Sequence, residues 1–348
     1  MNFKLENIVR KNIRELTPYS SARNEFSGKA SVFLDANENP YNFPYNRYPD
    51  PVQKKLKAKV SELYKLPTSN IFLGNGSDEA IDLTFRIFCD PGRDNVVSIT
   101  PSYGMYEVCA SVNDIGVKKV LLNKDYSFSS EAINLASDNY TKLIFLCSPN
   151  NPSGNLLEES EIIKLLDTFK GIVVVDEAYI DFSGSRGMLP HLDKYPNLII
   201  LRTFSKAWGL AGIRLGMAFA SKEIIELFTK VKYPYNLNIL TQEFALENLK
   251  DEKQKESWVE KIIRERGILE SKLSGLNTVE KVFPSDANFL LVKMSHAREM
   301  YDYLKEKEII VRDRTGVVLC NDSLRITIGT EAENALLMKE MEKFSGSV

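Results

Sequence analysis

Cysteine and histidine are scarce in this sequence of 348 residues, which has four cysteines and two histidines. The cysteines stand far apart without a CxxC pair, so we expect small buried side chains in a reducing cytoplasm, not a disulfide framework. The histidines, His191 and His296, are too few for a histidine-rich metal site, and neither lies near a motif typical of a Ser-His-Asp triad. No metal is therefore expected. The cysteines are Cys89, Cys109, Cys147 and Cys320.

Long apolar runs and long basic runs are missing as well. No stretch approaches about 18 apolar residues, so a membrane span is not expected. The N-terminal segment MNFKLENIVRKNIREL lacks the apolar core of a secretory signal, which favours a cytoplasmic location. Charged residues of mixed sign make up 26% of the chain, and the net charge is −2. A basic surface for nucleic-acid phosphates is therefore not expected, and neither nucleic acid nor membrane is a predicted partner.

The sequence does contain a regular alternation of short apolar runs and helical segments. The runs NVVSIT, TKLIFLCSP, GIVVVDEAY and NLIILRTFSKA are rich in β-branched residues, which predicts a mostly parallel, doubly wound α/β sheet. Beyond about residue 240, a long charged helix and the strands DANFLLVKM and LRITIGT indicate a smaller α+β domain. We expect an N-terminal arm at 1–30 that belongs to the small domain, a large domain at 31–245 and a small domain at 246–348.

Polar residues follow three of the predicted strands, where open α/β sheets bind their ligands. In GNGSDE, Ser77 and Asp78 would offer amides at a helix N-terminus, which is an anion site, although a turn capped by Asp78 fits equally well. CSPNNPSGN places Asn151 at the next strand end, which is also typical of a plain Asn-Pro loop. VVVDEAY ends in Asp176 and Tyr179. A carboxylate after four apolar residues must be paired, either with a ligand or as a helix cap.

Lys206 ends another apolar strand, with Ser205 before it and Arg214 eight residues after it. A lysine can form a Schiff base with an aldehyde, and a carboxylate can hold a pyridine nitrogen protonated. A helix N-terminus, hydroxyls and an arginine can hold a phosphate. Aldehyde, pyridine and phosphate on one molecule describe pyridoxal 5′-phosphate (PLP), which the sequence predicts on Lys206.

The motif order GNGSDE, PSYGMY, SPNNPSG, VVVDEAY, TFSKAWGLAGIRLG and LRITIG resembles that of class II aminotransferases, of PLP fold type I, over nearly the whole chain. The segments LTPYSSAR, LDANENP, YNRYPDP, PSDANFLL and IIVRDRTG are similar to those of the branch that acts on histidinol phosphate. The resemblance implies the fold type I architecture and a homodimer with shared active sites.

For the cofactor, the resemblance implies a role for each motif residue. Lys206 would carry PLP and act as the general base, Asp176 would pair with the pyridine nitrogen, and Tyr179 and Asn151 would donate to the ring oxygen O3′. Tyr103 would stack on the ring. The expected phosphate ligands are Ser77, Asp78, Ser205, Arg214 and, from the neighbouring subunit, Tyr48.

For the substrates, the resemblance implies that Arg325 binds the α-carboxylate of the amino donor with its planar fork. Tyr19, Asn151 and Arg312 would lie near the phosphate or carboxylate end. Arg312 by itself would be a solvated surface charge, and it is the spacing to Arg325 that favours a substrate role.

The implied reaction converts L-histidinol phosphate and 2-oxoglutarate to imidazole-acetol phosphate and L-glutamate, in histidine biosynthesis. An aromatic amino-acid aminotransferase or a threonine-phosphate decarboxylase shares much of this motif set, because such enzymes differ in pocket lining. A non-catalytic binding protein on the same fold is disfavoured, since the chain retains Lys206, Asp176, Tyr179 and Arg325 together.

Overall fold

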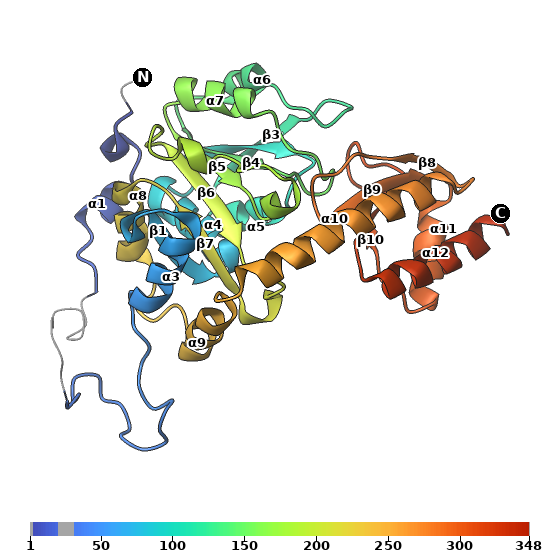
Figure 1. Ribbon diagram of the computed structural model, residues 1–348. Helices are drawn as coiled ribbons and strands as arrows, with labels where there is room; N and C mark the ends of the chain where they lie inside the picture. Colours follow the sequence, from blue (N-terminus) through green and yellow to red (C-terminus); the bar gives the residue numbers. More distant parts are fainter. Residues whose placement is uncertain (1–2, 20–30, 348) are drawn as a thin grey trace.

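Two sheets, joined by the long helix α10 (Glu252–Ser274), organise the chain in the computed structural model, which describes residues 3–19 and 31–347 (Figure 1). The predicted fold class, a mostly parallel sheet with a smaller α+β unit, is confirmed. Among the described residues, no helix is long and apolar enough to cross a membrane. All four cysteines are buried and free, as expected.

The large sheet has seven strands in the order β1-β7-β6-β5-β4-β2-β3. β7 runs antiparallel to both of its neighbours, and the remaining pairs are parallel. The carboxyl ends of β1, β4, β5 and β6 therefore meet at one edge. The strands are β1 (Ile71–Asn75), β2 (Asn95–Thr100), β3 (Gly116–Leu121), β4 (Thr141–Cys147), β5 (Ile172–Asp176), β6 (Leu198–Thr203) and β7 (Leu215–Phe219).

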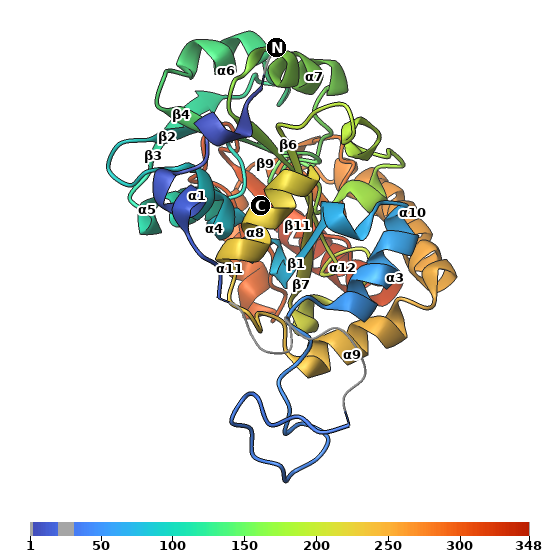
Figure 2. The same cartoon turned by 90° about the vertical axis from the view of Figure 1, so that its left-hand side faces the viewer.

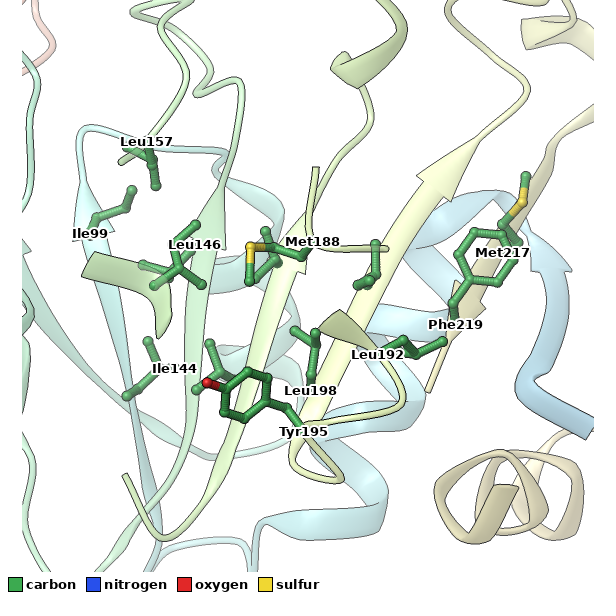
Figure 3. Close-up of a cluster of buried hydrophobic side chains, with 14 of the residues drawn as sticks. Ile99, Ile144, Leu146, Leu157, Met188, Leu192, Tyr195, Leu198, Met217 and Phe219 are labelled. Atoms are coloured by element: carbon green, nitrogen blue, oxygen red, sulfur yellow. The ribbon is translucent and has the colours of Figure 1, made fainter. Parts of the chain in front are cut away.

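Helices cover both faces of this sheet, which explains why its central strands are apolar without alternation. In β5, Val173 and Val175 pack with α3, α6, α7 and α9, and Figure 3 shows part of that cluster. Val174 faces the opposite side and packs with α4, α5 and α8. These helices are α3 (Lys54–Tyr64), α4 (Gly76–Phe88), α5 (Met105–Val112), α6 (Ser130–Ala136), α7 (Glu159–Thr168), α8 (Lys222–Val231) and α9 (Ile239–Asn248).

The smaller sheet is antiparallel, in the order β10-β11-β9-β8. Its core lies against α10 and the two following helices, and Thr330 begins the last helix with a capping box to Glu333. The elements are β8 (Val279–Val282), β9 (Phe289–Met294), α11 (Ala297–Glu306), β10 (Arg312–Asp313), β11 (Ser323–Thr327) and α12 (Glu331–Ser345). The 3-10 turns are Leu5–Asn7, Thr68–Asn70, Ile180–Phe182, Leu189–His191 and Ala211–Ile213.

The first described segment, which includes α1 (Lys11–Glu15), packs against the large sheet. Ile8, Val9 and Ile13 belong to the buried cluster that includes the apolar side chains of α4. Arg10 Nε donates to Asp90 Oδ1 at 3.1 Å. We expected residues 1–30 to belong to the small domain. The structure corrects this for the described part, because Ile8, Val9 and Ile13 are buried by the large domain. Residues 20–30 lie outside the described residues.

Residues 31–50, called the arm below, form no helix or strand and extend away from both sheets (Figures 1 and 2). The arm exposes large apolar side chains, with Leu34 89% and Phe43 88% accessible. Large apolar side chains exposed together in one segment are unusual for a surface that faces only water.

A stack of aromatic rings runs from the buried cluster around α4 to the carboxyl edge of the large sheet. The Phe145 ring in β4 lies 5.1 Å from that of Phe85 and 4.9 Å from that of Tyr106, with interplanar angles of 19° and 22°. We predict that Phe145→Ala lowers the free energy of unfolding by about 3–5 kcal/mol, because a fully buried ring leaves a cavity. Urea denaturation measures this. Leu135→Ala on α6, where the side chain is exposed, is the control, and an equal effect of both substitutions would contradict this packing.

Candidate active site

A cavity of about 150 Å³ lies at the carboxyl edge of the large sheet. It collects most of the polar residues predicted from the sequence, although they come from segments more than a hundred residues apart. A larger cavity of about 1050 Å³ lies at the opposite edge, beside Thr141, Gly171 and Asn197, and contains none of the motifs. The predicted residues that line the smaller cavity are Ser77, Asp78, Tyr103, Asn151, Asp176, Tyr179, Ser205, Lys206 and Arg214.

Lys206 follows β6 and extends toward Tyr179, with Nζ 5.4 Å from the centre of the tyrosine ring. Burial lowers the pKa of Lys206, and the positive charges of Arg325 and Arg214 lower it further, while Asp176 opposes them. A lowered pKa increases the fraction of neutral amine, which is the nucleophilic and basic form.

Asp176 is the last residue of β5 and is almost completely buried. Its Oδ2 accepts a hydrogen bond from Tyr106 Oη at 2.8 Å, and its Oδ1 accepts one from the Ala178 amide at 3.1 Å. Burial raises the pKa of Asp176 to about 6 in spite of these two donors and of Lys206. A cation beside this carboxylate would lower the pKa again, so the site suits a protonated ring nitrogen.

The start of α4 provides an anion site. Gly76 has φ of 69°, and a Cβ there would lie 2.6 Å from Arg214 Nη2, so a side chain would displace the guanidinium. Arg214 donates to Ser205 Oγ at 3.4 Å and to Asp78 Oδ2 at 3.3 Å. Tyr103 Oη donates to Asp78 Oδ1 at 3.1 Å. A helix N-terminus, a hydroxyl and a half-exposed arginine together fit a phosphate.

Arg325 in β11 brings the small domain to the cavity, since its guanidinium donates to Asn151 Oδ1. Its carbon Cζ lies 5.2 Å from the centre of the Phe289 ring. Within residues 3–19 and 31–347, its Nε is buried and has no hydrogen-bond partner. A buried unpaired donor on this guanidinium suits an incoming carboxylate.

Four predicted residues do not line the cavity, and one of them, Arg325, contacts it only through Asn151. Arg312 in β10 is exposed and lies opposite Arg325 in the β10–β11 register, near enough to lower the pKa of Arg325. Tyr19 is exposed at the end of the first described segment. Tyr48 lies on the arm, where its ring stacks on Tyr235 at 4.4 Å.

The family of class I and II aminotransferases matches residues 30–340 of this chain. The chain belongs to the class I and II aminotransferases. It is 57% identical to a histidinol-phosphate aminotransferase of Bacteroides fragilis, over 98% of this chain and 99% of that one.

Solved structures agree. The histidinol-phosphate aminotransferase from Clostridium acetobutylicum matches with a TM-score of 0.81 and 26% identity, covering 87% of this chain and 92% of that one. The enzyme from Sinorhizobium meliloti, solved with pyridoxal 5′-phosphate, shares the fold with a TM-score of 0.78 and 24% identity, over 86% of this chain and 83% of that one. The predicted family is thus confirmed.

Among class I and II aminotransferases PLP is the characteristic cofactor, and the residues of this cavity fit it. The anion site at α4, the buried Asp176 and the amine of Lys206 provide one partner each for phosphate, ring nitrogen and aldehyde. A metal ion is not needed for these contacts, and the described residues contain no cluster of three or more His, Cys, Asp or Glu side chains that could hold one.

Sequence reasoning missed Tyr106 and Cys147 as members of this site. Tyr106 is three residues after Tyr103, and their rings meet edge to face with centres 5.6 Å apart. Tyr103 precedes α5 and Tyr106 lies in its first turn, so no helical periodicity indicated the pair. Cys147 ends β4 opposite Asp176, which depends on strand register and leaves no local signal.

The raised pKa of Asp176 has a consequence for the apoprotein. Because the folded pKa of about 6 exceeds the unfolded value of 3.8, folding favours the protonated form. Its stabilising contribution is present below pH 4 and is lost as the pH rises through 6. We predict that Asp176→Asn makes the apoprotein more stable than the wild type at pH 7, by roughly 1–3 kcal/mol.

Urea denaturation of both apoproteins between pH 4 and pH 8 measures this difference. The advantage of the variant should grow between pH 4 and 6 and then level off. If the two stability curves stay parallel over this range, Asp176 does not have a raised pKa.

Proposed function

We propose that this chain is a histidinol-phosphate aminotransferase of histidine biosynthesis. It would transfer an amino group from L-histidinol phosphate to 2-oxoglutarate, yielding imidazole-acetol phosphate and L-glutamate. The observation that carries the chemistry is the convergence of Lys206, Asp176 and the anion site of α4 on one cavity. The choice of substrate follows from the 57% identity to a relative with that name. The free, buried cysteines also fit our proposal of a cytoplasmic location.

The cofactor contacts follow from the positions of the side chains. Bound PLP supplies an electron sink for the negative charge that develops when the substrate loses its Cα proton. Asp176 would keep the ring nitrogen protonated, because a buried carboxylate gains most from a nearby cation. Tyr179 and Asn151 would donate to the ring oxygen, and Tyr103 would cover a ring face. The amides of Ser77 and Asp78, with Ser205 and Arg214, would hold the phosphate.

Lys206 would bind the cofactor aldehyde and would later act as the base for the substrate's Cα proton. Its lowered pKa increases the share of neutral amine, the form that can take a proton from Cα and return it at another carbon. Tyr179 beside it excludes water from one side, since its ring is buried against Phe289. The amine is therefore shielded from solvent on that side.

Arg325 would bind the carboxylate of glutamate and, in the other half-reaction, the phosphate of the second substrate. Its unpaired Nε and its place between two domains suit an anion that arrives after the cofactor. Arg312, opposite on β10, adds a second positive charge for the phosphate dianion.

The substrate assignment is tested by measuring amino acceptors with glutamate as donor. We predict that kcat/KM for imidazole-acetol phosphate exceeds that for phenylpyruvate and 4-hydroxyphenylpyruvate by at least about a hundredfold, because only the first offers a phosphate to the arginines. Lys206→Ala should remove the activity with every acceptor, while Lys250→Ala at an exposed lysine should not. Higher activity with the aromatic acids would favour the aromatic aminotransferase, and turnover by Lys206→Ala would contradict the mechanism.

We also propose that the chain works as a two-fold homodimer whose arm completes the partner's site. Support comes from the apolar side chains that the arm exposes and from the position of Tyr48 outside the cavity of its own chain. Two-fold dimers make isologous contacts, so both sites would be equivalent.

A mixed dimer tests this sharing. One subunit has Tyr48→Phe and the other has Lys206→Ala. If Tyr48 acts across the interface, the only site with a lysine receives an intact tyrosine and should bind PLP with wild-type affinity. If Tyr48 acts within its own chain, that affinity should match the Tyr48→Phe homodimer, and the shared-site proposal is wrong.

A further inference from the structure

A buried ammonium group joins the base of the arm to the large domain. Lys232 follows α8 and is only 9% exposed. Its Nζ donates to three backbone carbonyls, those of Pro51 at 2.8 Å, Tyr233 at 3.0 Å and Pro234 at 2.9 Å. A fourth oxygen, Asn236 Oδ1, lies 3.1 Å away. Lys232 therefore links two segments that are about 180 residues apart in the sequence.

The charge of Lys232 is suited to this shell of oxygens. Burial, against the opposing charge of Glu79 and with a smaller contribution from Lys57, lowers its pKa to about 8, so the ammonium form predominates at pH 7. An ammonium has three donors and no lone pair, which matches a site composed only of acceptors. An apolar side chain there would leave buried carbonyl groups without a partner.

Asn236 extends the contact from Lys232 to the anion site. Its Nδ2 donates to Glu79 Oε1 at 3.1 Å and to the Leu73 carbonyl at 3.0 Å. Glu79 Oε2 in turn accepts from the Asn75 amide at 2.6 Å. Asn75 ends β1 directly before Gly76, where α4 begins. The position of this helix start is therefore tied to the residues around Lys232.

The same loop also reaches Tyr48. Tyr235, between Pro234 and Asn236, stacks on the Tyr48 ring with an interplanar angle of 13°. On the arm side, Glu38 accepts from the Tyr48 amide at 2.6 Å and pairs with Arg47 at 2.7 Å. The orientation of Tyr48 is thus set by contacts inside its own chain.

We propose that Lys232 is a positioning residue for the cofactor phosphate, because it holds the arm that bears Tyr48 and the amides of α4 in one fixed arrangement. This inference rests on the role proposed above for Tyr48. Lys232 touches neither cofactor nor substrate. Its effect should therefore be confined to the phosphate end, and the ring contacts of Asp176 should be unaffected.

Binding of PLP and of pyridoxal, which lacks the phosphate, to the apoprotein separates this role from a general structural one. We expect Lys232→Met to raise the dissociation constant of PLP about tenfold, comparable to the loss of one hydrogen bond to a charged group. The dissociation constant of pyridoxal should change less than about twofold. Lys230→Met is the matched control, because Lys230 lies on α8 and donates to Arg14 O at the surface. Spectroscopic titration of the apoproteins gives the dissociation constants.

The outcomes separate the two proposals. If Tyr48→Phe does not weaken PLP binding, the role of Tyr48 is wrong. If Tyr48→Phe weakens it but Lys232→Met leaves it unchanged, or weakens PLP and pyridoxal alike, the role of Lys232 is wrong. In the double variant we expect a loss smaller than the product of the single losses, and full additivity would contradict action through the arm.

A second variant covers the case in which Lys232→Met does not fold. Gln53 donates through Nε2 to the Pro51 carbonyl at 3.0 Å and to Asn236 Oδ1 at 3.1 Å, in the same junction. Gln53→Ala removes these two bonds, and it should also weaken PLP binding but not pyridoxal binding. Equal weakening of both ligands would overturn the proposal.

Discussion

The buried carboxylate of Asp176 is the constraint on which the rest of this site depends. It ends a strand that is packed on both faces, so it has little water, and burial raises its pKa to about 6. Tyr106 and the Ala178 amide compensate only part of that cost. A cation beside the carboxylate would complete the compensation, and in our proposal the protonated pyridine ring of the cofactor is that cation. The unliganded site therefore already favours binding of a cation beside Asp176.

The remaining contacts divide between two domains. The large sheet supplies Lys206, Asp176 and the anion site at one edge because its parallel strands end together. The small domain supplies Arg325, which reaches Asn151 across the boundary. Further contacts hold the boundary, such as that of Asp286 Oδ2 with the Leu156 amide at 2.8 Å. In the proposed function, cofactor chemistry and recognition of the substrate's anion would therefore be divided between the two domains.

Sequence reasoning located the fold class and the residues at the strand ends, because apolar runs followed by Asp176 or Lys206 are local signals. It misplaced the N-terminal segment, since the burial of Ile8 and Ile13 against α4 depends on packing that periodicity does not reveal. It also missed Tyr106 and Lys232. Their partners, Asp176 and the Pro51 carbonyl, are 70 and 181 residues away. The roles predicted for the site residues stay predictions, and Tyr19 and Tyr48 do not line the cavity of a single chain.

The central claim is that this cavity binds PLP through Lys206. Reduction of the reconstituted protein with borohydride, followed by digestion and mass spectrometry, tests it directly. The account predicts that the pyridoxyl group is found on the peptide containing Lys206, with the other lysines unmodified at one equivalent of cofactor. Labelling of another lysine, or no labelling of a protein that binds PLP, would contradict it.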